Sequence, residues 1–120
     1  MRCLPLSKKK KQRKIVKDIF LWWRSNTGFS LWNITLNFAK YMDGGCTAGN
    51  CAANWKYLTA TLTFSDDAIR DMSRNELEEL VVHEMMHMLI NEMREGKIKH
   101  EERVATSLQK AFMWVKGADK

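Results

Sequence analysis

Two histidines and one glutamate stand at a spacing that suits metal chemistry. They are His83, Glu84 and His87, in a stretch that reads His-Glu-x-x-His between apolar residues. Four residues turn an α-helix through roughly 400°, so the two imidazoles share one face, a turn apart, and can bind one Zn²⁺. Glu84 lies about 100° round the helix, where its carboxylate can reach a water on the metal.

This set of groups predicts a hydrolytic site. Neutral imidazole suits zinc, the ion lowers the pKa of its water toward about 7, and a carboxylate beside that water can accept its proton. Placing Glu84 among so many apolar residues is costly unless the carboxylate has a use. The alternative interpretation is a helix with two surface histidines and a methionine-rich core face.

A catalytic zinc ion takes three protein ligands and keeps one open position, so a third ligand must come from elsewhere. The sequence His-Glu-Glu at residues 100–102 opens the last predicted helix. Glu101 is in phase with the apolar face of that helix, which consists of Val104, Leu108, Phe112 and Val115. Glu102 and His100 lie about 100° to either side of that face. We therefore rank Glu101 first, Glu102 second and His100 third, and the alternative is an ordinary acidic helix start.

The elements that must position these residues predict an α+β fold. Hydrophobic periodicity and turn residues indicate, in chain order, a helix over 8–25, a strand over 29–39, a turn-rich loop over 43–50, a strand over 55–64, a helix ending near 91 and a helix over 99–115. Ser73 followed by Glu76 has the spacing of a capping box, which predicts where the helix carrying the histidines begins.

The stretch from residue 80 to residue 108 resembles the gluzincin branch of zincin metallopeptidases, and most of all small bacterial and phage-encoded members of minimal form. In that branch, His-Glu-x-x-His on one helix is completed by a glutamate on a following helix. The resemblance implies zinc as cofactor, His83 and His87 as ligands, Glu84 as general base and a glutamate of the pair 101–102 as third ligand. It also implies a minimal zincin-like fold: an N-terminal helix, a small sheet with an antiparallel edge, the motif helix and a C-terminal helix.

The same resemblance implies that the strand over 55–64 is the edge strand above the cleft, with which a substrate backbone would pair. Its threonine-rich face carries Tyr57, Thr59 and Thr61, which we expect to bind substrate. The family's oxyanion-stabilising Tyr or His has no clear counterpart, and Tyr57, Tyr41 and His100 are candidates.

Two features depart from the larger members of this family. These place an aspartate four residues after the ligand glutamate, where it orients the first histidine. Ala105 or Thr106 stands there in this chain, depending on which glutamate is the ligand. The glycine of the metzincin extension is also missing, because Ile90 occupies its place.

The positive charge is concentrated at the N-terminus. The first 17 residues contain eight Lys and Arg and no acid, whereas the whole chain has a net charge of +6. We divide the chain into a basic tail over 1–14 and one metallopeptidase domain over 15–120. A basic cluster of this kind attracts nucleic acid or anionic lipid, and the alternative is a solvated helix start.

Cysteine content and hydropathy indicate the compartment. Cys3, Cys46 and Cys51 are odd in number, which argues against a disulfide framework, although together they could bind a second metal. We find no signal peptide and no apolar run of about 18 residues that would span a membrane. We therefore expect a cytoplasmic protein, in a bacterial or phage-infected host cytosol.

Three functions follow from these features. The first is a zinc metallopeptidase that hydrolyses peptide bonds in a protein or peptide substrate, with Glu84 as general base. The second is a nucleic-acid-associated protease of the SprT-like kind, localised by its basic N-terminus. The third is a non-catalytic zincin-fold protein that uses metal for structure or interaction.

Overall fold

A computed structural model describes residues 4–27, 29–40, 48–91 and 101–118. Within these ranges the elements are, in chain order, α1 (Leu4–Asn26), β1 (Asn33–Ala39), β2 (Gly49–Asn54), β3 (Thr59–Ser65), α2 (Asp66–Ile69), α3 (Arg74–Ile90) and α4 (Glu101–Ala118). Helices and a small mixed sheet are therefore both present, and the α+β prediction is confirmed.

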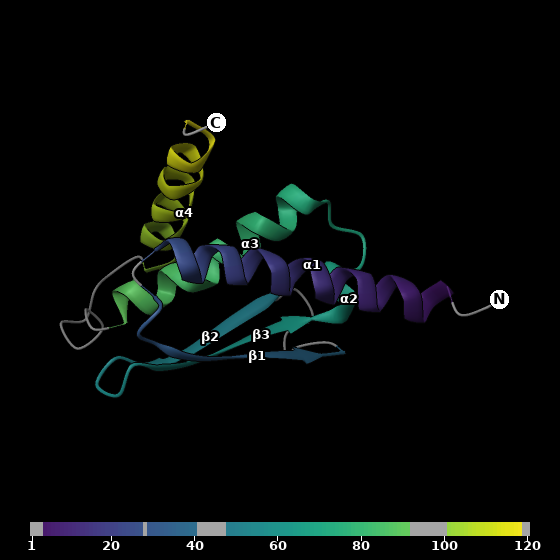
Figure 1. The fold of residues 1–120 in the computed structure, drawn as a ribbon, viewed down its shortest axis with the longest axis horizontal. Helices are drawn as coiled ribbons and strands as arrows, with labels where there is room; N and C mark the ends of the chain where they lie inside the picture. The colour runs from purple at the N-terminus through teal and green to yellow at the C-terminus, as the bar shows by residue number, and fades with distance from the viewer. Residues whose placement is uncertain (1–3, 28, 41–47, 92–100, 119–120) are drawn as a thin grey trace.

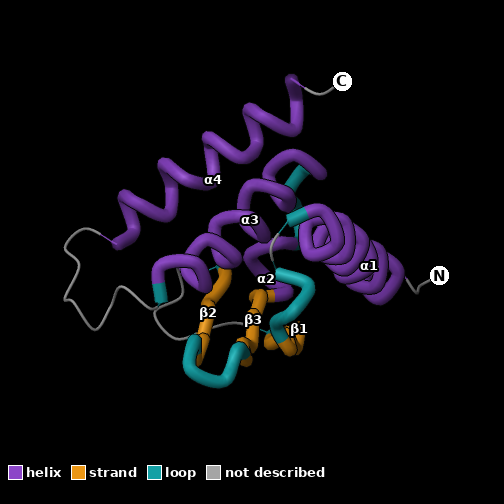
Figure 2. The backbone as a smooth tube through the Cα atoms, turned by 60° about the vertical axis from the view of Figure 1, so that its left-hand side comes forward, coloured by secondary structure: helices purple, strands orange, loops and turns teal. Residues whose placement is uncertain are grey.

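The sheet has the strand order β1-β3-β2. β1 runs parallel to β3, with Asn33 opposite Thr59, while β2 runs antiparallel to β3, with Asn54 opposite the same residue. In both views of the backbone α1 and α3 lie on one side of the sheet, and α4 lies beyond α3 (Figures 1 and 2). The packing contacts agree, since α3 touches β2, α1 and α4. The helix with the two histidines is thus enclosed between a sheet edge and a second helix.

The predicted strand over 55–64 is correct only in its second half. β3 starts at Thr59, and residues 55–58 form the turn that joins it to β2. Asn54 makes this turn, because its carbonyl accepts a hydrogen bond from the Tyr57 N–H at 3.2 Å and its side chain accepts one from the Lys56 N–H at 3.1 Å. Leu58 adopts a positive φ of 53°, which a continuous strand would not allow.

The edge-strand prediction is wrong for the same segment. β3 is the central strand, and the edge next to α3 is β2, part of which fell in the predicted loop over 43–50. β2 has few residues with high β-propensity, so its pairing with β3 rather than its own sequence makes it a strand. Its inward-facing residues are small, namely Gly49, Cys51 and Ala53, and this allows α3 to lie close to it.

The N-terminus of α3 is fixed as predicted. The Ser73 side chain accepts a hydrogen bond from the Glu76 N–H at 3.1 Å, and the Glu76 carboxylate accepts one from the Ser73 N–H at 2.9 Å. Both contacts of the capping box are therefore present. Val81, Met85 and Met88 of the same helix are buried in the core. Burial of one face and capping of the first turn together hold the histidine-bearing helix in place.

The described part of the basic N-terminal segment, residues 4–14, is helical and lies within α1. α1 is continuous across the predicted boundary between residues 14 and 15. Gln12 is buried and donates hydrogen bonds to the carbonyls of Ile69 and Met72, at 2.6 and 3.0 Å. Among the described helices, none has the length and apolar character needed to cross a membrane.

Candidate metal centre

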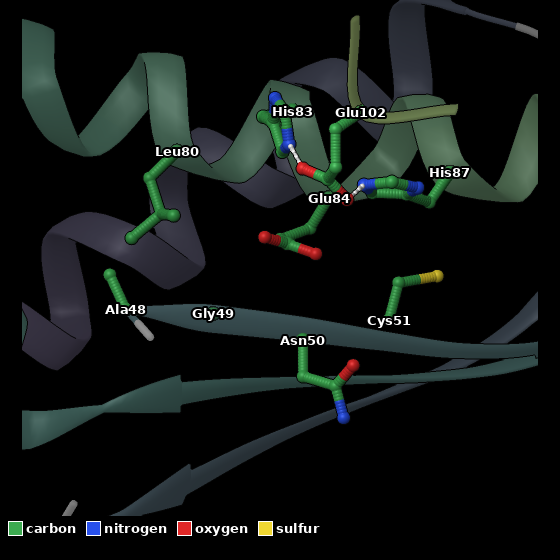
Figure 3. A pocket seen from close by; sticks show the side chains of 9 residues that line it. All are labelled: Ala48, Gly49, Asn50, Cys51, Leu80, His83, Glu84, His87 and Glu102. Carbon is green, nitrogen blue, oxygen red and sulfur yellow. Dashed lines mark hydrogen bonds and ion pairs between the residues drawn. The ribbon is translucent and has the colours of Figure 1, made fainter. Parts of the chain in front are cut away.

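His83 and His87 point their Nε2 atoms toward one carboxylate, that of Glu102 (Figure 3). Glu102 Oε1 lies 2.9 Å from His83 Nε2, and its Oε2 lies 2.9 Å from His87 Nε2. One donor atom from each of the three residues lies within 4.8 Å of the other two. The predicted pairing of the two histidines on one face of a helix is present, and a carboxylate from α4 joins them.

The residue ranked first as third ligand is not the one in this position. Glu101 contacts the far nitrogen of His87 instead, with its Oε2 2.6 Å from Nδ1. Glu101 is in phase with the apolar face of α4, so its side chain points into the contact between α4 and α3. The two Nε2 atoms lie to the side of that contact, toward β2, so Glu102, about 100° away, reaches them. His100 lies outside the described residues.

Glu84 shares the pocket with the three donors. The pocket has a volume of about 480 Å³ and is lined by Leu80, His83, Glu84 and His87 of α3, Glu102 of α4 and residues 48–51 at β2. Figure 3 shows the Glu84 side chain directed from α3 toward β2. Glu84 is only 6% exposed, and its burial raises the pKa of the carboxyl even though His83 and His87 oppose the rise.

Gly49 allows the edge strand to pass directly over Glu84. A Cβ atom at this position would lie 3.1 Å from both Cγ and Oε2 of Glu84. That separation is tighter than ordinary van der Waals contact, so with a side chain at this position the Glu84 side chain would have to shift by a few tenths of an ångström. The sequence predicts only a turn-rich loop around Gly49. Nothing in its local sequence indicates that a distant helix passes there.

The outer nitrogens of the two imidazoles also have partners on α4. Gln109 Oε1 lies 3.1 Å from His83 Nδ1, and Thr106 Oγ1 lies 3.5 Å from the same atom. Gln109 was not among the predicted site residues. Its position, two helical turns after Glu102, was the only signal in the sequence that could have indicated it.

The three residues expected to bind substrate do not line this pocket. Tyr57 is 76% exposed in the turn before β3, and Thr59 and Thr61 lie on the central strand. That expectation took β3 for the edge strand, which it is not, so the substrate-binding role of these three residues stays a prediction. Of the candidates for oxyanion stabilisation, Tyr41 lies outside the described residues, as His100 does.

One cysteine lines the pocket. Cys51 of β2 is buried there, and Figure 3 shows its side chain on the same side of the strand as His87. Cys3 and Cys46 lie outside the described part of the chain. The predicted alternative of a second metal bound by three cysteines therefore stays a prediction.

The donor set is of a kind that can hold a metal ion. Two imidazole nitrogens and one carboxylate oxygen converge, which matches the ligand types of catalytic zinc sites with three protein ligands. The partners at both Nδ1 atoms leave the Nε2 atoms facing the same point. These three residues could therefore hold a divalent metal ion.

Comparisons with protein-family models, with curated proteins and with solved structures find no match to this chain.

Proposed function

We propose that the protein is a zinc-dependent metallopeptidase. The observation that carries the proposal is the buried carboxylate of Glu84 in the same pocket as the donors of His83, His87 and Glu102. Those three residues would hold the metal. When bound, zinc would polarise a carbonyl group and lower the pKa of a water toward about 7.

Glu84 would act as the general base. A carboxylate in this position can accept a proton from a water in the pocket and later pass it to the leaving amine. Its burial supports this role, because desolvation raises the pKa of the carboxyl toward the range in which it can both take and return a proton. The pocket walls at Leu80 and Gly49 keep this carboxylate close to the donors.

The geometry of the sheet favours an extended polypeptide as substrate. Among the described strands, β2 pairs with β3 alone, so its other edge offers backbone groups beside the pocket. An extended peptide could add to this edge by backbone hydrogen bonds and present one of its carbonyl groups to the pocket. We therefore place the substrate along β2, in place of the strand expected from the sequence.

Metal analysis of the purified protein, paired with two glutamine variants, tests the proposal. We expect about one zinc per chain for a site with one set of three ligands. Glu84→Gln should retain the metal and lower hydrolysis of an unfolded protein substrate by about 10²-fold or more. Glu79→Gln, the same change elsewhere on α3, is the matched control and should keep both. Full hydrolysis by the Glu84→Gln protein would refute the role of Glu84, and metal with no hydrolysis by the wild type would favour the non-catalytic alternative.

A second function, association with nucleic acid, is favoured by the exposed basic residues of α1. Some of its basic residues pair with acidic side chains, and others face solvent. Lys8 contacts Asp71 at 2.8 Å, while Lys9 and Arg13 contact Asp66 at 3.7 and 2.5 Å. Four more lysines of this helix, Lys10, Lys11, Lys14 and Lys17, are exposed, whereas Arg24 donates a hydrogen bond to the carbonyl of Trp32 at 3.1 Å. Of these lysines, Lys14 pairs with the exposed Asp18 one turn away, and exposed pairs of this kind are weak.

We propose that these four exposed lysines contact phosphate groups. Binding of a labelled DNA duplex should then weaken as salt rises, and Lys10→Ala should reduce the slope of log affinity against log salt by about 1. Lys110→Ala on α4 is the matched control and should leave the slope unchanged. Equal slopes for the two variants would reject this surface.

The predicted location in a bacterial or phage-infected host cytosol stays a prediction.

A further inference from the structure

Every ring nitrogen of the two histidines has a partner on α4. The Nε2 atoms of His83 and His87 both face Glu102, each at 2.9 Å. Their Nδ1 atoms face two other residues, with Gln109 Oε1 at 3.1 Å from His83 and Glu101 Oε2 at 2.6 Å from His87. Three side chains of a single helix thus surround both imidazoles.

The partners at Nδ1 determine how each ring can bind a metal. A neutral imidazole carries a proton on one of its two nitrogens, and only the other nitrogen has a lone pair that can bind a metal ion. An acceptor oxygen at Nδ1 holds the proton there and leaves Nε2 free to ligate. The carboxamide oxygen of Gln109 and the carboxylate of Glu101 are both acceptors. The same contacts also stop each ring from turning about its Cβ–Cγ bond.

Gln109 is better placed for this role than its neighbour Thr106. The Thr106 hydroxyl oxygen lies 3.5 Å from His83 Nδ1, longer than a normal hydrogen bond to nitrogen. Gln109 is closer by several tenths of an ångström and is 8% exposed, so water competes little for its oxygen. Burial of a primary amide is costly without partners, and the contact with His83 offsets part of that cost.

We propose that Gln109 and Glu101 are positioning residues that set the tautomer and the orientation of His83 and His87 for metal binding. The inference rests on the metal site of the proposed function and extends it to two residues that are not among its three donors. Glu101, the residue expected from the sequence to ligate, has a different task from Glu102. Glu102 would bind the ion, and Glu101 would hold the ring that binds it.

Zinc affinity measured by competition with a chromophoric chelator tests this role without any activity assay. Gln109→Leu removes the acceptor at similar size and should weaken zinc binding about 10–100-fold. Gln109→Glu keeps an acceptor oxygen and should restore most of the affinity. Lys110→Leu, an exposed neighbour on the same helix, is the matched control and should bind zinc like the wild type.

A second variant and a spectroscopic measurement separate positioning from folding. Glu101→Ala lies in the first turn of α4, outside the core, and should also weaken zinc binding about 10–100-fold. In the zinc-loaded wild type, a slowly exchanging Nδ1–H proton of His83 should appear in nuclear magnetic resonance spectra, and Gln109→Leu should abolish it.

The outcomes distinguish this inference from the function on which it rests. A wild-type protein that binds no zinc would overturn both. A wild type that binds zinc, with Gln109→Leu and Glu101→Ala binding it equally tightly, would overturn the positioning role alone. Weaker binding by both variants, with rescue by Gln109→Glu, is the expected result.

Discussion

Replacing Ala105 with leucine should separate α4 from α3 and weaken the metal site. Ala105 is 0% exposed on a helix that packs chiefly against α3. It lies between Glu102 and Gln109, about one turn from each, so a displacement of the helix here moves both residues. A methyl group at this position lets the two helices approach closely enough for side chains of α4 to reach the histidines.

The expected magnitude has two parts. Adding methylene groups to a filled core costs about 1–3 kcal/mol, which lowers the melting temperature by roughly 4 °C for each kcal/mol. If the helix relieves the clash by moving about 1 Å, the ligands leave the tolerance of about 0.5 Å that a preorganised site requires. We expect zinc affinity to fall about 100-fold, equivalent to roughly 2.8 kcal/mol.

Chelator competition and thermal unfolding of the metal-free protein measure these two parts. Ser107→Leu is the matched control, since Ser107 is exposed on the same helix and receives the same side chain. It should leave zinc affinity unchanged. An Ala105→Leu protein that binds zinc as tightly as the wild type would refute the reasoning, because close contact between the two helices would then not position the ligands.

Three further changes have definite expected results. Gly49→Ala places a Cβ 3.1 Å from Glu84 Oε2, so hydrolysis should fall by up to about 10²-fold with zinc retained, and unchanged hydrolysis would contradict the close approach. The hydrogen bond from Arg13 lowers the pKa of Asp66 below its ordinary 3.8, so this pair stabilises the fold above that pH and loses its contribution as the pH falls. Asp66→Asn should therefore lower the free energy of unfolding, measured in urea at pH 6, by about 1–3 kcal/mol. This loss is smaller than that expected for a wholly buried ion pair, because Arg13 is partly exposed. At pH 3 the loss should be smaller still. Phe64→Ala should cost about 3–5 kcal/mol in the same measurement, because the ring is 0% exposed, and a smaller loss would mean that the core closes over the cavity.

The sequence alone determined the features that depend on local geometry. The spacing of His83 and His87 places them on one face of any helix, and Glu84 follows at a fixed angle. The capping box of Ser73 and Glu76 likewise acts within one turn, so it could be predicted without knowing the fold. Helix periods and caps of this kind repeat in every structural context, which is why they could be predicted from the chain.

The tertiary structure decided which distant residues meet these histidines. Whether Glu101 or Glu102 reaches the two Nε2 atoms depends on how α4 crosses α3. These two glutamates are about 100° apart round the helix, and the position of the apolar face alone does not show which of them reaches the histidines. The same crossing brings Gln109 to His83. The edge strand at the pocket is β2, a segment of small residues whose strand character comes from pairing with β3. Long-range pairing and helix packing are set by the whole core, and no short segment of sequence contains that information.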